Sequence, residues 1–210
     1  MQGMRGRIKE TVLTAMARVP REMFVPDHLR SRAYDDMPLP IGFNQTISAP
    51  HMVAIMCDLL DLRVGMVVLE VGGGCGYHAA VMADLVGTQG HIYSVERIPE
   101  LVAQARKNLV AAGIKNVTMI EGDGSIGLPL HAPYDRISVA ATAPSVPEPL
   151  QQQLKPGGRM VLPVGLGFQE LVLVTRKNGF VTEEKMNEVL PLFLLFDMCK
   201  ECGEDYEDEG

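Results

Sequence analysis

The sequence predicts an α/β fold, a doubly wound and mostly parallel sheet with an antiparallel C-terminal hairpin and an N-terminal helical extension. From about residue 64 the chain alternates short apolar runs with amphipathic stretches, which is typical of repeated strand, helix, strand units. After residue 165, two strand-like runs at 171–176 and 180–190 flank Lys177-Asn178-Gly179, and Asn-Gly is a strong hairpin signal. The parallel part of the sheet is therefore expected to precede an antiparallel pair.

Residues 1–62 are predicted to be an extension of the same domain that carries a substrate loop. Their pattern differs from the alternation that follows, because prolines interrupt it repeatedly. The extension contains, in order, a helical pattern up to Val19, breaks at prolines 20 and 26, a loop with prolines 38 and 40, and a helical run over 50–62.

Residues 63–200 hold the predicted core. Its five expected parallel strands are the apolar runs 67–71, 91–96, 117–121, 135–141 and 159–164. The clearest helix between them is 99–112, where Pro99 suits the first turn and Gly113 the end. Apolar residues recur on one face of this helix at positions 101, 105 and 109.

The charge of the chain is concentrated at its end. The 210 residues include 19 Lys and Arg against 26 Asp and Glu, for a net charge of −7. Six of the carboxylates fall in residues 201–210, which we expect to be a disordered, solvated tail, so residues 1–200 carry only −1. Charge alone therefore does not decide between protein, small-molecule and RNA partners.

Composition indicates a cytoplasmic protein without a metal site. No apolar run approaches the roughly 20 residues of a membrane span, so no membrane association is expected. Four cysteines do not resemble a secreted disulfide scaffold, and Cys199 and Cys202 have no second pair with which to form a zinc site. A monomer is expected.

A glycine loop follows the first core strand, in the run Glu70-Val71-Gly72-Gly73-Gly74-Cys75-Gly76. Glycines there let the backbone approach a ligand closely, and the next helix start favours polar or anionic groups. Glu96 ends the second strand, twenty residues after Gly76, and Asp123-Gly124 follows the third. An acidic residue at that spacing suits ribose hydroxyls, although Glu96 and Asp123 could also be solvated strand ends. The loop also satisfies G-x-G-x-x-A, which leaves NAD open.

Two features resemble the class I S-adenosylmethionine-dependent methyltransferases, which have a Rossmann-like fold. They are Glu70, two places before the first glycine, and the run Leu154–Gly158 (LKPGG) entering the fifth strand. The resemblance implies S-adenosylmethionine as cofactor and S-adenosylhomocysteine as product. It implies, as cofactor-binding residues, Glu70, Gly72, Gly74 and Gly76 beside the methionine part, Glu96 on the ribose, and Asp123 and Gly124 beside the adenine.

Ser48 has two interpretations. It stands just before a helix that begins near Pro50, and from position alone we expect it to be the N-cap of that helix. However, the string PLPIGFNQTIS (38–48), with 122–137 and 146–165, resembles the protein-L-isoaspartate O-methyltransferase family over roughly residues 8–177. The resemblance implies that Ser48 is catalytic and that Gln45, Thr46 and Ile47 lie over cofactor and substrate.

The implied reaction methylates the free α-carboxylate of L-isoaspartyl residues in aged proteins and peptides. The ester then closes to a succinimide, whose hydrolysis returns some normal aspartate. Two alternatives stay open, namely a class I methyltransferase acting on a small molecule or RNA, and a cofactor-binding protein without turnover. The QTIS segment favours the protein substrate over nucleic acid. The chain departs from the family at Val53, where some members carry a cofactor-contacting His, and over 191–210.

Overall fold

A computed structural model describes residues 8–165, 169–177 and 179–190. The N-terminal part consists of α1 (Glu10–Arg18), the 3-10 helices η1 (Arg21–Phe24) and η2 (Asp27–Arg32), the strands β1 (Leu39–Gly42) and β2 (Gln45–Ile47), and α2 (Pro50–Leu60). The remainder consists of β3 (Val67–Val71), α3 (Tyr77–Val86), β4 (His91–Glu96), α4 (Pro99–Ala111), β5 (Val117–Glu121), η3 (Gly124–Ile126), η4 (Pro129–His131), β6 (Tyr134–Val139), α5 (Glu148–Gln152), β7 (Leu154–Val164), β8 (Gln169–Lys177) and β9 (Phe180–Leu190).

Seven strands form one sheet in the order β5-β4-β3-β6-β7-β8-β9. Strands β3 to β7 pair in parallel, whereas β8 is antiparallel to both β7 and β9. The chain starts at β3 in the middle, moves outward through β4 and β5, and then returns to the other side of β3 with β6. The carboxyl ends of β3 and β6 therefore flank a topological switch point, where open α/β sheets bind ligands.

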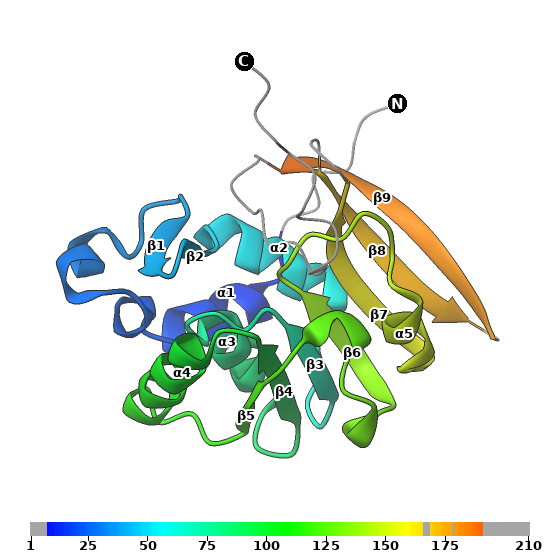
Figure 1. Ribbon diagram of the computed structural model, residues 1–210, viewed down its shortest axis with the longest axis horizontal. Coiled ribbons are helices and arrows are strands. Elements are labelled where there is room, and N and C mark those ends of the chain that lie inside the picture. Colours follow the sequence, from blue (N-terminus) through cyan, green and yellow to red (C-terminus); the bar gives the residue numbers. More distant parts are fainter. Residues whose placement is uncertain (1–7, 166–168, 178, 191–210) are drawn as a thin grey trace.

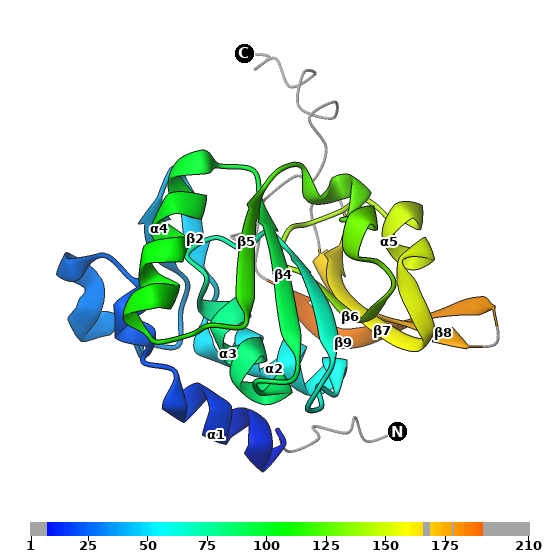
Figure 2. The same ribbon diagram turned by 90° about the horizontal axis from the view of Figure 1, so that it is seen from below.

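Helices cover both faces of the sheet. Figure 2 shows α1, α2 and α3 gathered on one side and α5 on the other. Side chains of β3 alternate between the two cores, with Val68 in the first and Leu69 and Val71 in the second. The first core also takes in α1 and η1, so the N-terminal extension packs against the rest of the chain (Figure 1). This is the doubly wound arrangement that the sequence predicted.

Most predicted elements are confirmed, with shifted ends. The predicted strand 135–141 runs from Tyr134 to Val139, and the predicted strand 159–164 already begins at Leu154. The LKPGG run, expected to lead into this strand, is part of β7, and the register of the β6–β7 ladder shifts there. The helix expected over 50–62 ends at Leu60, because Asp61 adopts φ 50°.

The loop predicted around prolines 38 and 40 is in fact a short antiparallel hairpin, β1–β2. Its two-residue turn is Phe43-Asn44, and both residues have φ 54°. Positive φ at both positions is characteristic of the turns that match strand twist, which usually contain glycine. Because Phe43-Asn44 is neither Asn-Gly nor Gly-Gly, the sequence did not indicate a hairpin turn at this position.

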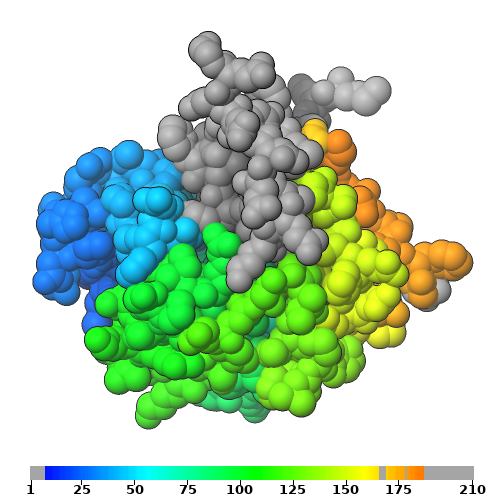
Figure 3. Space-filling model, viewed as in Figure 1, coloured from blue at the N-terminus to red at the C-terminus, as the bar shows by residue number. Residues whose placement is uncertain are grey.

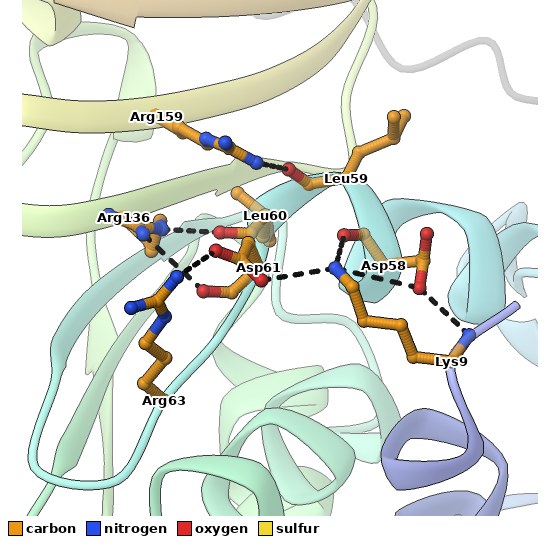
Figure 4. Close-up of polar contacts among 8 residues, drawn as sticks. All are labelled: Lys9, Asp58, Leu59, Leu60, Asp61, Arg63, Arg136 and Arg159. Carbon is orange, nitrogen blue, oxygen red and sulfur yellow. Dashed lines mark hydrogen bonds and ion pairs between the residues drawn. The ribbon is translucent and has the colours of Figure 1, made fainter.

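Cations hold the C-terminal end of α2 against the sheet (Figure 4). Arg136 of β6 donates to the carbonyl oxygens of Leu60 and Asp61, and Arg159 of β7 donates to that of Leu59 at 3.1 Å. Carbonyls in the last turn of a helix lack partners within the helix. A positive charge there interacts favourably with the negative end of the helix dipole. Because only Ala49 separates Ser48 from α2, this anchor also helps to fix the segment that carries the candidate site.

The N-terminal extension and the C-terminal strands form opposite flanks of the molecule (Figure 3). Across the described residues, no helix combines the length and apolar character that crossing a bilayer requires. The predicted acidic tail, Cys199, Cys202 and the departure at 191–210 lie outside the described residues.

Candidate active site

A pocket lies at the switch point of the sheet. Its wall is built from the carboxyl ends of β3, β4, β5 and β6 together with the segment that joins β2 to α2. It brings together ten of the eleven residues that the sequence predicted, which are Gln45, Thr46, Ile47, Ser48, Glu70, Gly72, Gly74, Glu96, Asp123 and Gly124. The remaining one, Gly76, faces Ala105 and Leu109 of α4 instead.

The glycine loop fits tightly against β4. The backbone N–H groups of Gly72 and Gly73 both donate to the carbonyl of Val95, at 2.9 and 3.1 Å. A Cβ on Gly73 would lie 2.2 Å from Oγ of Ser94, so a larger residue there would require Ser94 to shift. Sequence reasoning missed Gly73, because the need for glycine arises from a neighbouring strand. At positions 72–74 the loop thus presents only backbone to the pocket.

Glu96 is 6% exposed, so the solvated strand-end interpretation is wrong. Its Oε2 accepts from the N–H of Gly74 at 2.9 Å, and its Oε1 accepts from that of Ile98 at 3.0 Å. A carboxylate offers about four acceptor positions, so each oxygen can still accept one more hydrogen bond from the pocket. That capacity suits a pair of neighbouring hydroxyl groups.

Asp123 and Gly124 shape the pocket beyond β5. Oδ1 of Asp123 accepts from the N–H of Ser125 at 2.9 Å and caps η3, while the side chain stays exposed to solvent. A Cβ on Gly124 would lie 2.3 Å from Cγ1 of Val71. The exposed position of Asp123 therefore combines a local structural role with a place on the pocket wall.

Glu70 and His78 form a buried polar pair beneath the loop. Oε2 of Glu70 accepts from the Ser94 hydroxyl at 2.5 Å, whereas its Oε1 has no partner and lies 3.6 Å from Nδ1 of His78. Burial raises the pKa of Glu70 to about 8, and the Ser94 hydrogen bond only partly opposes this. Burial also lowers the pKa of His78 to about 4. At neutral pH the close approach is therefore mainly a contact between uncharged groups rather than an ion pair.

The β1–β2 hairpin delivers Ser48 to the opposite side of the pocket. Ile41 of β1 lies against the glycine loop, since a Cβ on Gly74 would come 3.4 Å from its Cδ1. The N-cap of α2 is Ala49, and the side chain that accepts from the first turn is Asp36, whose Oδ1 binds the N–H of His51 at 3.0 Å. The N-cap interpretation of Ser48 is therefore wrong, because the helix begins one residue later than that role requires. Ser48 instead lines the pocket.

Several wall residues carried no signal that distinguished them in the sequence. Tyr77 and His78 follow Gly76 directly and could be taken as packing of the helix start. Ala140 and Ala141 lie after β6 at the switch point, where no polar residue marks the strand end. Val53 lines the wall too, so the position at which the chain departs from the family offers an apolar surface.

Comparisons with known proteins identify the family to which the chain belongs. The family model for protein-L-isoaspartate(D-aspartate) O-methyltransferase (PCMT) matches residues 2–194. A protein-L-isoaspartate O-methyltransferase of Methanothrix thermoacetophila is 64% identical over 189 residues, covering 90% of each chain. The chain belongs to this family.

Solved structures extend the match. The structure of a protein-L-isoaspartate O-methyltransferase is 34% identical in sequence and superposes with a TM-score of 0.78. The match covers 85% of the present chain and 59% of the other chain. A Plasmodium falciparum structure described as a beta-aspartate methyltransferase (PCMT) in complex with S-adenosyl-L-homocysteine covers 85% of this chain and 87% of its own. Its TM-score is 0.76 and its identity 26%. Within the family, the present chain keeps the seven-stranded mixed sheet and the N-terminal helix.

Proposed function

We propose that this protein transfers a methyl group from S-adenosylmethionine to the free α-carboxylate of L-isoaspartyl residues in proteins and peptides. The transfer starts repair through a succinimide. The observation that carries the proposal is the common wall shared by the QTIS segment, the glycine loop and the acidic strand ends. Family membership supports the same substrate. All of these segments come from one chain, so we propose that a monomer is active.

The residues of the pocket fit this cofactor. The pocket wall combines apolar side chains with a few polar groups, as sites for small molecules do. Glu96 has acceptor capacity for the ribose hydroxyls, and the loop of Gly72 and Gly74 allows close backbone approach to the methionine part with Glu70 behind it. Asp123 and Gly124 would lie beside the adenine. When bound, the cofactor supplies a sulfonium-activated methyl group.

The chain's own contribution to the chemistry is positioning. The α-carboxyl group titrates at about 3.3–3.7, so it is an anionic nucleophile at neutral pH without help from a base. In the proposal, the Ser48 hydroxyl donates to one carboxylate oxygen and leaves the other free to attack. Gln45, Thr46 and Ile47 close over the reactants and limit the access of water. Holding two reactants in line is a large source of rate enhancement.

The substrate is tested with methyl-labelled S-adenosylmethionine and paired peptides that differ only in Asp or isoAsp. We expect base-labile label on the isoAsp peptide alone. Equal labelling of both peptides would contradict the proposed substrate. Binding of S-adenosylhomocysteine without any transfer would favour a cofactor-binding protein that lacks turnover.

For Ser48→Ala we expect methyl transfer to fall more than about 10-fold while the affinity for S-adenosylhomocysteine stays within about twofold. The free energy of unfolding should change by less than about 0.5 kcal/mol, because Ser48 does not cap α2. Ser31→Ala is the matched control, since Ser31 is an exposed serine in the same extension. Normal turnover of the Ser48 variant would remove this residue from the mechanism.

A further inference from the structure

Arg21 is a fully buried cation in the Val19–Pro26 run (VPREMFVP), a segment to which neither the sequence nor the proposed reaction assigns a task. Its side chain is 0% exposed. It lies on η1 together with Phe24, and the i, i+3 spacing of a 3-10 helix puts both side chains on one face. Both contact Tyr77. The guanidinium carbon of Arg21 is 4.7 Å from the centroid of that ring, and the ring of Phe24 is 5.5 Å from it.

The guanidinium group of Arg21 holds two backbone carbonyls that are distant in sequence. Nε donates to the carbonyl oxygen of Ala33 at 2.7 Å, and Nη2 donates to that of Ser48 at 2.7 Å. Ala33 follows η2, and Ser48 joins β2 to α2. A planar group with donors in a fixed fork sets the distance between its two acceptors more rigidly than a flexible side chain could.

This arrangement is costly, because Arg21 has no carboxylate partner. None of the ion pairs among the described residues includes it, and its Nη1 is buried without a hydrogen-bond partner. Buried charges in proteins are normally paired, since removing an unpaired charge from water is unfavourable. An apolar residue of similar volume would avoid that cost but could not hold the two carbonyls.

Arg21 stands directly behind the pocket. It does not line the cavity itself, but both Ser48 and Tyr77, which it contacts, do. Its bond to the Ser48 carbonyl fixes the backbone at the residue whose hydroxyl the proposed function uses. Its contact with Tyr77 ties that backbone to the start of α3, immediately after the glycine loop. Arg21 thus links the two walls of the pocket.

We propose that Arg21 is a positioning residue for methyl transfer, which holds the Ser48 backbone in register with the glycine loop. The inference rests on the proposed role of Ser48. Arg21 acts through Ser48, so its removal should harm transfer only while the Ser48 hydroxyl is present. A purely structural role would lower stability and leave the turnover of the folded protein unchanged.

The test is a double-mutant cycle of Arg21→Met and Ser48→Ala on the full chain. The rate of transfer to an isoAsp peptide and the Kd of S-adenosylhomocysteine are measured at a temperature where unfolding curves show each variant folded. We expect Arg21→Met to lower kcat/KM more than about 10-fold in the wild-type background and less than about threefold in the Ser48→Ala background. The Kd should change less than about threefold. Arg30→Met, which removes an exposed arginine of η2, is the control and should retain full activity.

Equal effects of Arg21→Met in both backgrounds would overturn the inference, as would normal turnover of the folded variant. If Arg21→Met does not fold, the cycle is run with Arg21→Lys, which keeps the charge but cannot span both carbonyls. The same non-additive loss is expected of it. A fully active Ser48→Ala variant would show instead that the proposed role of Ser48 has failed, and with it the basis for the role of Arg21. Absence of isoAsp labelling by the wild type would show that the proposed function itself has failed.

Discussion

Glu70 and Glu96 lie on neighbouring strands, yet their surroundings give the two carboxyl groups different chemistry. Glu96 accepts hydrogen bonds from two backbone N–H groups and has acceptor capacity left for the pocket. Glu70 receives one hydroxyl hydrogen bond and is fully buried, so burial raises its pKa to about 8. Glu96 is therefore placed to accept hydrogen bonds from a ligand, whereas Glu70 holds a proton in the folded protein.

The raised pKa of Glu70 predicts that the free energy of unfolding falls as the pH rises from about 4.5 to about 8. The folded state keeps this proton up to about pH 8, whereas the unfolded chain loses it near the ordinary value of 4.5. Between these values the folded state binds more protons, so the free energy of unfolding decreases as the pH rises. From pH 6.5 to 8 we expect the wild type to lose about 1–2 kcal/mol relative to Glu70→Gln. Urea denaturation of the cofactor-free protein at several pH values measures this difference.

His78 supplies the control for that measurement, because its effect falls in a different pH window. Burial lowers the pKa of His78 to about 4 from an ordinary 6.5, so the unfolded state binds more protons between these values. Stability should therefore rise with pH up to about 6.5 and show no further contribution from His78 above it. Parallel pH profiles of the wild type and Glu70→Gln from pH 6.5 to 8 would contradict the assignment to Glu70.

Among the elements, the β1–β2 hairpin and α2 determine where Ser48 stands. The hairpin returns the chain over the glycine loop within nine residues, from Leu39 to Ile47. The helix that follows is held at its far end by Arg136 and Arg159 (Figure 4). Ser48 is thus fixed between an element anchored to the loop and an element anchored to the sheet.

The hairpin turn predicts a stabilising substitution. Phe43 has φ 54° and is 55% exposed, so it bears left-handed strain without much burial in return. We expect Phe43→Gly to raise the free energy of unfolding by about 0.5–1 kcal/mol, because glycine adopts positive φ without strain. Asn44→Gly is the matched control with the same φ, and its gain should be smaller, since asparagine tolerates this region. Chemical denaturation compares the three proteins; a destabilised Phe43→Gly would show that the ring contributes packing that outweighs the strain.

The anchor of α2 predicts a large effect from one buried arginine. Arg136→Met leaves the carbonyls of Leu60 and Asp61 without their donor, and an unsatisfied buried acceptor costs about 1–3 kcal/mol. We expect a loss of about 2–4 kcal/mol in the free energy of unfolding. Arg63→Met removes an exposed arginine from the same cluster and should cost less than about 0.5 kcal/mol. Similar losses for the two variants would mean that the cluster acts by charge alone.

At the scale of the whole molecule, the sheet gathers the site from both halves of the chain. The pocket wall draws on residues from Gln45 to Ala141, and the parallel strands end together at the switch point. A ligand that occupies this wall contacts the extension and the core at once. Its binding should therefore stabilise the folded chain as a unit.

We expect S-adenosylhomocysteine at 100 times its Kd to raise the free energy of unfolding by about 2.7 kcal/mol at 25 °C. Ser48→Ala should keep this stabilisation, because its hydroxyl is assigned to the substrate. NAD at the same concentration should give none, which distinguishes the methyltransferase site from the dinucleotide alternative. Thermal unfolding followed by circular dichroism measures each case, and stabilisation by NAD alone would contradict the cofactor assignment.

Local patterns determined much of this protein. Strand and helix periodicity, the glycine run and the Asn-Gly dipeptide at 178–179 are signals from residues close together in the chain, so the sequence predicted the parallel sheet, the closing hairpin and Glu96 at a strand end. The QTIS segment likewise indicated the family, because its residue sequence alone resembles the family's. Each of these features is encoded within a short window.

Tertiary structure alone decided features that depend on distant neighbours. The Phe43-Asn44 turn lacks the usual glycine. Because α2 starts at Pro50, its N-cap is Ala49 and not Ser48. Gly73 leaves room for Ser94, which lies on another strand and occupies the space where a Cβ would be. Arg21 became informative only when the fold brought it to the carbonyls of Ala33 and Ser48. Burial and hydrogen bonding across long sequence separations set these properties, and no local pattern contains them.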